Sequence, residues 1–218
     1  MNGDDDTAAR LRDVLRFLAH DAREGYSSTL ALLELHRVNA EPMPVNDLVQ
    51  RIERTARRSL ARIDDFVTLE RARSQPLNVE ELDLLDLLFD AVAEAWHAAN
   101  ERGVRLKAAD APEEALLQAD RGLLRSAIGR LLKHALERAQ RGSVLVCAVH
   151  PLAHGWSVKI DESPNSAVAA PPGTSTARVD DRYGWALVEL VARRMGGDAT
   201  QWHDPEQGVR LRVTLPRP

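Results

Sequence analysis

The chain has 218 residues, 44% hydrophobic and 28% charged, which is enough for one large domain or two small ones with a buried core. Its formal net charge is -4, with basic and acidic residues interspersed, so it lacks the basic footprint typical of nucleic-acid binders. A single cysteine, Cys147, excludes an intramolecular disulfide and a zinc site built from several cysteines, and is typical of a reducing compartment.

No apolar run approaches the roughly 20 residues that a membrane-spanning helix needs. The N-terminus, Met-Asn-Gly-Asp-Asp-Asp, is acidic and does not have the pattern of a signal peptide. We therefore expect a cytoplasmic protein that has no contact with the membrane.

The first third of the chain has the pattern of two amphipathic helices. Apolar residues recur at helical spacing over residues 7–37 and again over 45–73. The segment 39–44 contains two prolines and separates them, so a helical hairpin is predicted. A lone hairpin cannot bury both apolar faces, and we therefore expect a homodimer in which two hairpins form a four-helix bundle.

After a linker at residues 74–76 the pattern changes to alternating helices and short strands. Helices are predicted at 83–100, 120–139 and 183–195, strands at 103–108, 115–119, 144–149, 156–160, 198–203 and 209–215, and a loop at 163–181. The expected fold class is α+β: a helical hairpin, residues 1–75, followed by an α/β sandwich, residues 76–218, with helices on one face of a mixed sheet.

His20 is the candidate reactive residue of the first helix. It lies two residues after Leu18, about 200° around the helix axis, on a face that is mostly polar. A neutral imidazole nitrogen is a competent nucleophile near pH 7, and the adjacent carboxylate of Asp21 can orient the ring and accept its proton. A histidine beside an acid also occurs on many ordinary solvated surfaces.

The block 17–25, Phe-Leu-Ala-His-Asp-Ala-Arg-Glu-Gly, resembles the H-box of two-component sensor histidine kinases. The resemblance implies that His20 receives a phosphoryl group from ATP and passes it to an aspartate of a receiver protein. It makes His20, Asp21, Arg23 and Glu24 the candidate catalytic residues. The family usually has Thr, Ser or Asn at the position of Glu24, to align water for phosphatase activity, and proline at the position of Gly25.

Residues 76–216 resemble the ATP-binding domain of the same kinases, which is shared with gyrase and Hsp90-type ATPases. The segment 123–138 fits the hydrophobic frame of the N-box. Arg130 and His134 occupy the positions at which the family has two asparagines that hold magnesium and phosphates. Arginine has no acceptor atom, and magnesium prefers oxygen ligands, so both are poor replacements, although Arg130 can contact an anion.

Asp161 matches the family's aspartate that reads the adenine amino group, but the two glycines that follow it in the family are Ser163 and Asn165 here. The glycine-rich segment that would bind phosphate before the last helix retains only Gly184.

Asp180 and Asp181 precede that last helix, and their charges would repel a triphosphate. The sequence therefore predicts a nucleotide-domain fold from which most nucleotide ligands have been lost.

A row of four arginines lies along the second helix: Arg51, Arg54, Arg58 and Arg62. It is either a solvated face or a surface for an acidic partner, such as the aspartate-lined pocket of a receiver domain.

Together these patterns predict a signalling protein that carries phosphate on His20 and exchanges it with a response-regulator receiver aspartate, without a bound cofactor. One alternative is an active soluble histidine kinase that uses ATP and magnesium, with Asp161, Arg130, His134 and Gly184 as nucleotide contacts. The other is a non-enzymatic scaffold that binds a receiver or a competent histidine kinase.

Overall fold

The computed structural model describes residues 13–39, 43–109, 112–163, 182–204 and 208–216. The chain divides into two compact units, Met1–Val67 and Thr68–Pro218. The predicted division at residue 75 remains a prediction. The predicted loop at 163–181 lies almost entirely outside the described residues, as do Asp180 and Asp181.

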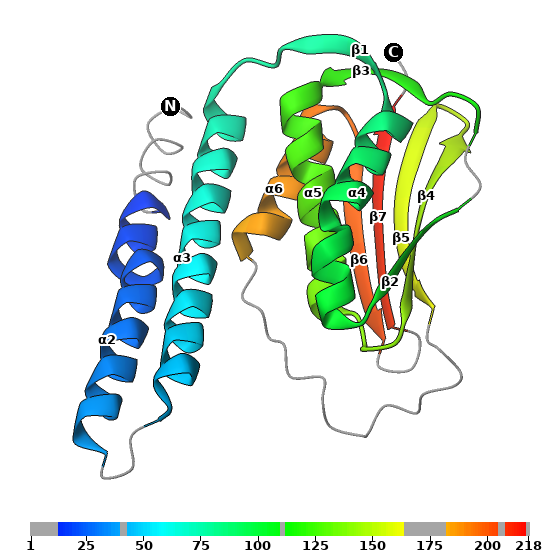
Figure 1. Cartoon of the computed structure of the whole chain (residues 1–218). Helices are drawn as coiled ribbons and strands as arrows, with labels where there is room; N and C mark the ends of the chain where they lie inside the picture. The colour runs from blue at the N-terminus through cyan, green and yellow to red at the C-terminus, as the bar shows by residue number, and fades with distance from the viewer. Residues whose placement is uncertain (1–12, 40–42, 110–111, 164–181, 205–207, 217–218) are drawn as a thin grey trace. The chain divides into compact units, whose positions relative to one another are not determined.

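The first unit is the predicted helical hairpin, in which α2 (Ala22–Val38) runs antiparallel to α3 (Val45–Ser74) (Figure 1). The expected helices at 7–37 and 45–73 are confirmed from residue 13 onward. One local difference is a π-helical segment, η1 (Phe17–Asp21), inside the first helix. A π-helix has i→i+5 hydrogen bonds and therefore a wider turn, which apolar spacing does not predict.

The second unit contains a five-stranded mixed sheet and a separate two-stranded ribbon. The sheet has the order β2-β4-β5-β7-β6, in which β2 and β4 are parallel and the other pairs antiparallel, and the ribbon pairs β1 with β3. The strands are β1 (Val79–Asp83), β2 (Arg105–Ala108), β3 (Leu116–Asp120), β4 (Val144–Leu152), β5 (Gly155–Ser163), β6 (Asp198–Asp204) and β7 (Gly208–Pro216).

Three helices, α4 (Leu84–Arg102), α5 (Arg121–Arg138) and α6 (Arg182–Arg194), cover one face of the sheet (Figure 1). α5 lies between α4 and α6 and packs against both. The mixed sheet with helices on one face, and the α+β fold class, are therefore confirmed.

Aspartates at the ends of the ribbon strands begin two of these helices. The Asp83 carboxylate accepts a hydrogen bond from Leu85 N at 2.9 Å and caps α4, while Asp120 accepts from Leu123 N at 3.0 Å and caps α5. A carboxylate at this position satisfies backbone N–H groups that have no partner within the helix. The strand-to-helix turns of this unit are therefore determined by local sequence.

The core of the second unit lies between the helices and the sheet. Fully buried leucines of α4 and α5 meet the inward side chains of the central strands β4, β5 and β7. A smaller cluster joins Leu69 and Ala72, near the end of α3, to Ala127, Leu187 and Val191 of α5 and α6. The last turns of α3 thus pack as part of the second unit.

The sequence did not predict β1, because Val-Glu-Glu-Leu-Asp is rich in acids and buries only Leu82. Its pairing with β3 outweighs its weak strand propensity. Within the described part of the chain, no helix combines the length and apolarity that crossing a bilayer requires.

Candidate functional site

His20 lies in the π-helical segment η1, and its side chain is exposed to solvent. Single π-turns inside α-helices are uncommon and occur often at functional sites. His20 and Glu24 are exposed, as expected for a mostly polar face, whereas Phe17 is buried. The imidazole is therefore accessible to a reaction partner from solvent.

Three contacts between the two helices of the hairpin bracket His20. On its N-terminal side the rings of Phe17 and Phe66 stack, with centroids 4.1 Å apart and planes 2° from parallel. On its C-terminal side Arg62 Nη1 donates to Glu24 Oε2 at 2.7 Å. Both contacts come from one face of α3, since Phe66 and Arg62 are one helical turn apart.

The third contact is the close approach of α2 and α3 at Gly25. A Cβ at this position would lie 1.8 Å from Ser59 Oγ and 2.8 Å from Ser59 Cβ. The Thr29 hydroxyl donates a hydrogen bond to the carbonyl of Gly25 at 2.9 Å. A side chain at residue 25 would therefore collide with Ser59 of the opposite helix.

Of the other candidate residues near His20, Arg23 is exposed on α2, and the side chain of Asp21 lies outside the described residues. A role for Asp21 in orienting the imidazole therefore remains a prediction. Glu24 stands where the family usually has Thr, Ser or Asn, and its carboxylate is in an ion pair across the hairpin.

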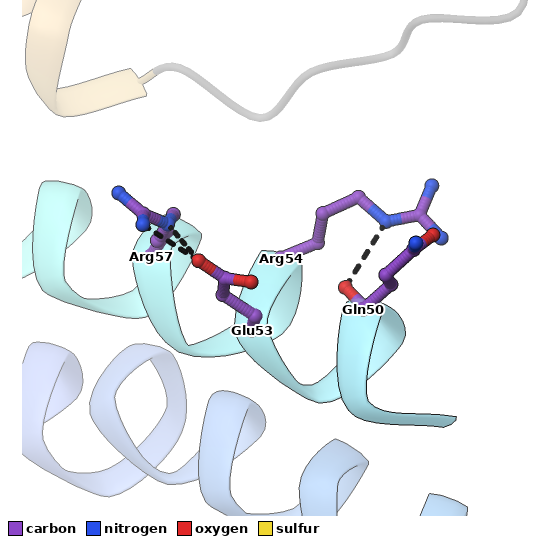
Figure 2. A network of polar contacts seen from close by, with 4 residues as sticks. All are labelled: Gln50, Glu53, Arg54 and Arg57. Atoms are coloured by element: carbon purple, nitrogen blue, oxygen red, sulfur yellow. Dashed lines mark hydrogen bonds and ion pairs between the residues drawn. The ribbon is translucent and has the colours of Figure 1, made fainter. Parts of the chain in front are cut away.

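The arginine row of α3 divides by what its members contact. Figure 2 shows Arg54 lying back along its own helix, where Nε donates to the carbonyl of Gln50 at 3.4 Å. The neighbouring Arg57 forms an exposed pair with Glu53 one turn earlier (Figure 2). Arg62 instead reaches the opposite helix, next to the turn that contains His20.

The position of the second N-box asparagine is occupied by a buried histidine. His134 is 2% exposed on α5, and its ring lies 5.3 Å from that of Trp185. Arg138 Nη1 lies 2.8 Å from His134 Nδ1, and Gln201 Oε1 lies 2.8 Å from His134 Nε2. Guanidinium only donates, so Nδ1 accepts and the Nε2–H group donates to Gln201. Both ring nitrogens are therefore engaged in hydrogen bonds within the second unit.

Arg130, at the first N-box position, is half-buried on α5 one turn before His134. Gly184 is buried in the first turn of α6. Arg130 and Gly184 thus lie on helices that cover one face of the sheet.

Asp161 lies on the opposite face of the sheet from those positions. Side chains alternate along β5, and Val158 and Ile160 face the helices, so Asp161 points to the open face. There its carboxylate accepts a hydrogen bond from Arg210 Nε on β7 at 3.1 Å. Asp161 therefore does not come together with Arg130, His134 and Gly184.

The carboxylate that does face the helices is Glu162, which the sequence analysis did not single out. It is 8% exposed and accepts hydrogen bonds from Gln140 N at 2.7 Å and Val209 N at 2.9 Å. A Cβ at Gly208, where φ is +82°, would lie 2.4 Å from Glu162 Oε2. The alternation of apolar residues along 156–160 is the signal that would have found Glu162.

The described residues at the nucleotide-site positions do not fit magnesium-ATP. Arg130 has no acceptor atom, His134 uses both nitrogens internally, and Asp161 faces away. Among the residues whose placement is described, no group of three or more His, Cys, Asp or Glu side chains is arranged to hold a metal ion.

Comparison with known proteins finds similarity to a sensor histidine kinase. The chain is 28% identical over 149 residues to the sensor histidine kinase TrcS of Mycobacterium tuberculosis, a match that covers 66% of the chain but only 28% of TrcS. No protein-family model matches.

Solved structures agree with the sequence match. Histidine kinase AdeS of Acinetobacter baumannii superposes with a TM-score of 0.68 at 14% identity, over 90% of this chain and 97% of that chain. Histidine kinase ThkA, in its complex with the response regulator TrrA, superposes with a TM-score of 0.71 at 14% identity, over 99% of this chain and 64% of that chain. The chain is thus similar in sequence to a sensor histidine kinase and shares the fold of solved histidine kinase structures.

Proposed function

We propose that this protein acts in two-component signal transduction by carrying phosphate on His20 and exchanging it with the aspartate of a response-regulator receiver domain. In this proposal the imidazole nitrogen attacks phosphorus of the receiver's aspartyl phosphate, an N–P bond forms and the acyl phosphate P–O bond breaks. The aspartate leaves as a carboxylate, and transfer onward is the reverse step. No nucleotide takes part, and the reaction takes place in the cytoplasm.

The observation that carries this proposal is a contrast between the two units. His20 is exposed in a π-helical turn of a hairpin. The positions of the family's nucleotide ligands instead hold an arginine, Arg130, a histidine with hydrogen bonds inside the domain, His134, and an aspartate in an outward-facing ion pair, Asp161. A phosphoacceptor without a fitting nucleotide site suits transfer between proteins. The ThkA structure, a kinase in complex with a response regulator, supports a receiver as the partner.

Homodimerisation through the hairpin belongs to the same proposal. Many large apolar side chains of the hairpin are exposed in the single chain, which argues for a partner that covers them. They are Leu15, Tyr26, Leu30, Leu33, Leu35, Val38, Val45, Val49, Leu60 and Val67.

An active histidine kinase is the second candidate, and the sequence match to a sensor histidine kinase over 149 residues favours it. In that case ATP and magnesium supply the phosphoryl group to His20. A scaffold that binds a receiver or a competent kinase without carrying phosphate is the remaining outcome.

The test is transfer of labelled phosphate to the purified protein, from magnesium-ATP in one reaction and from phosphorylated receiver domains in another. The His20→Ala variant is the control in both, because it removes the acceptor nitrogen without disturbing the buried contacts around it. Label from receivers alone that requires His20 is the expected result.

Label from ATP that requires His20 would establish the kinase instead. The absence of label from both donors would contradict phosphotransfer and leave the scaffold.

A further inference from the structure

We propose that Arg62 is a positioning residue for the phosphoryl group on His20, and that its ion pair with Glu24 is the resting state of a two-position switch. This inference rests on the proposed function, because it requires His20 to carry phosphate. It assigns a role in the phosphorylated state to a cation from the opposite helix.

The first step of the argument is proximity. His20 and Glu24 are four residues apart on one helix, and side chains at this spacing are neighbours on the same face. Arg62 Nη1 is 2.7 Å from Glu24 Oε2, so the guanidinium lies at the residue that follows His20 by four positions on the same helix.

The second step is that α3 holds Arg62 in place. Phe66 is one turn after Arg62 and stacks on Phe17, while Ser59 is three residues before it and contacts the backbone surface at Gly25. These two contacts fix the register of the hairpin on both sides of Arg62. Arg62 has a side chain 32% exposed, against 60% for Glu24, so the arginine is the more confined partner.

The third step is charge. Phosphate on His20 brings nearly two negative charges close to the Glu24 carboxylate. A guanidinium can bind phosphate oxygens through two parallel N–H groups, which gives a stronger contact than its single hydrogen bond to Glu24. Arg62 therefore moves from Glu24 to the phosphoryl group when His20 is phosphorylated, and returns when the phosphate leaves.

This switch affects how long phosphohistidine survives. In hydrolysis a water oxygen attacks phosphorus, the P–N bond breaks, the ring nitrogen takes a proton, and inorganic phosphate is released. A cation beside the phosphoryl group stabilises its charge and disfavours protonation of the ring. Arg62 is therefore expected to lengthen the phosphohistidine lifetime, and Glu24 to shorten it by holding Arg62 away.

The experiment uses phosphoramidate as the phosphate donor, so that it depends on neither ATP nor a receiver. The imidazole nitrogen attacks phosphorus, the P–N bond of phosphoramidate breaks, and ammonia leaves. Phosphate on the peptide that contains residue 20 is then followed by mass spectrometry at neutral pH, with His20→Ala as the blank for the other histidines.

Arg62→Gln is expected to lose phosphate about two- to fivefold faster than the wild type, and Glu24→Gln to lose it more slowly by a similar factor. Arg62→Lys should be intermediate, because it keeps the charge but not the planar fork. Arg54→Gln, on the same arginine row but bonded to its own helix, is the matched control and should match the wild type.

The decisive result is that the phosphohistidine lifetime changes in opposite directions in Arg62→Gln and Glu24→Gln. Both Arg62→Gln and Glu24→Gln break the same ion pair, so a purely structural pair would shift both lifetimes in the same direction. Lifetimes that shift in the same direction would overturn the switch. So would equal lifetimes in the wild type and both variants, or failure of His20 to accept phosphate from phosphoramidate. A failure of receivers to label His20 would instead overturn the proposed function, while the phosphoramidate result for Arg62 would stand.

Discussion

At the scale of single residues, Gly25 determines how closely the two helices of the hairpin approach. The hydroxyl of Ser59 occupies the space where a Cβ at residue 25 would lie. In the sequence, Gly25 is notable only because the family usually has proline at this position. In the structure, the opposite helix excludes a side chain at residue 25, next to the turn that contains His20.

We expect Gly25→Ala to destabilise the hairpin by about 1 to 3 kcal/mol, because the added methyl group must displace Ser59 or separate the helices. The measurement is the free energy of unfolding from urea titration followed by circular dichroism. Adding Ser59→Gly should recover part of the loss by restoring clearance.

Gly129 provides the matched control, since it is also helical but a Cβ there meets no atom within 4 Å. Gly129→Ala is expected to stabilise the protein by roughly 0.5 to 1 kcal/mol through helix propensity alone. Stabilisation by Gly25→Ala to the same extent would contradict the close approach.

The residues of the nucleotide-site comparison show where sequence reasoning reached its limit. The match of Asp161 to an adenine-reading aspartate relied on its place after a strand, and ignored which face of that strand it occupies. Strand parity assigns the inward position to Glu162, and this parity was available in the sequence. The burial of His134 was not available, because Trp185 and Gln201 meet it only in the folded domain.

At the scale of secondary-structure elements, periodicity predicted every described α-helix and most strands. It failed for η1 and β1, for different reasons. The π-turn occurs where Phe17 stacks on a residue 49 positions later in the chain, and β1 depends on pairing with β3. Contacts between residues far apart in the chain are not contained in local propensity.

The hairpin's exposed apolar side chains predict how it associates. Leu30 on α2 is 65% exposed and Leu60 on α3 is 61% exposed. The double variant Leu30→Glu, Leu60→Glu is expected to shift the protein from dimer to monomer, because it places charges in the predicted bundle core. Analytical ultracentrifugation at micromolar concentration measures the change.

Glu53→Gln, at an exposed polar position of α3, serves as the control and should leave the dimer intact. A wild-type protein that sediments as a monomer at all concentrations would refute the four-helix bundle.

At the scale of the whole molecule, the single cysteine makes the free energy of unfolding depend on pH. Cys147 lies in the core on β4, and burial raises the pKa of its thiol from 9.0 to about 12. The folded state therefore retains a thiol proton that the unfolded chain releases at lower pH.

Because the folded pKa is raised, this contribution to stability is fully present below pH 9 and is lost as pH rises toward 12. The free energy of unfolding should fall by up to about 1.4 kcal/mol per pH unit in that window from this group alone. Urea titrations at several pH values measure the slope. Cys147→Ala should have a shallower slope, and equal slopes would show that the thiol does not titrate differently in the two states.

The buried carboxylate of Glu162 has one more consequence, for exchange of backbone amides with deuterated water. It binds N–H groups from two segments far apart in the chain, at Gln140 after α5 and at Val209 in β7. The Gln140 amide follows a helix end, where exchange is ordinarily fast because such ends open locally. Here its release requires the ends of β5 and β7 and the end of α5 to separate together, so deuterium should enter both amides at the same slow rate, as a single cooperative opening.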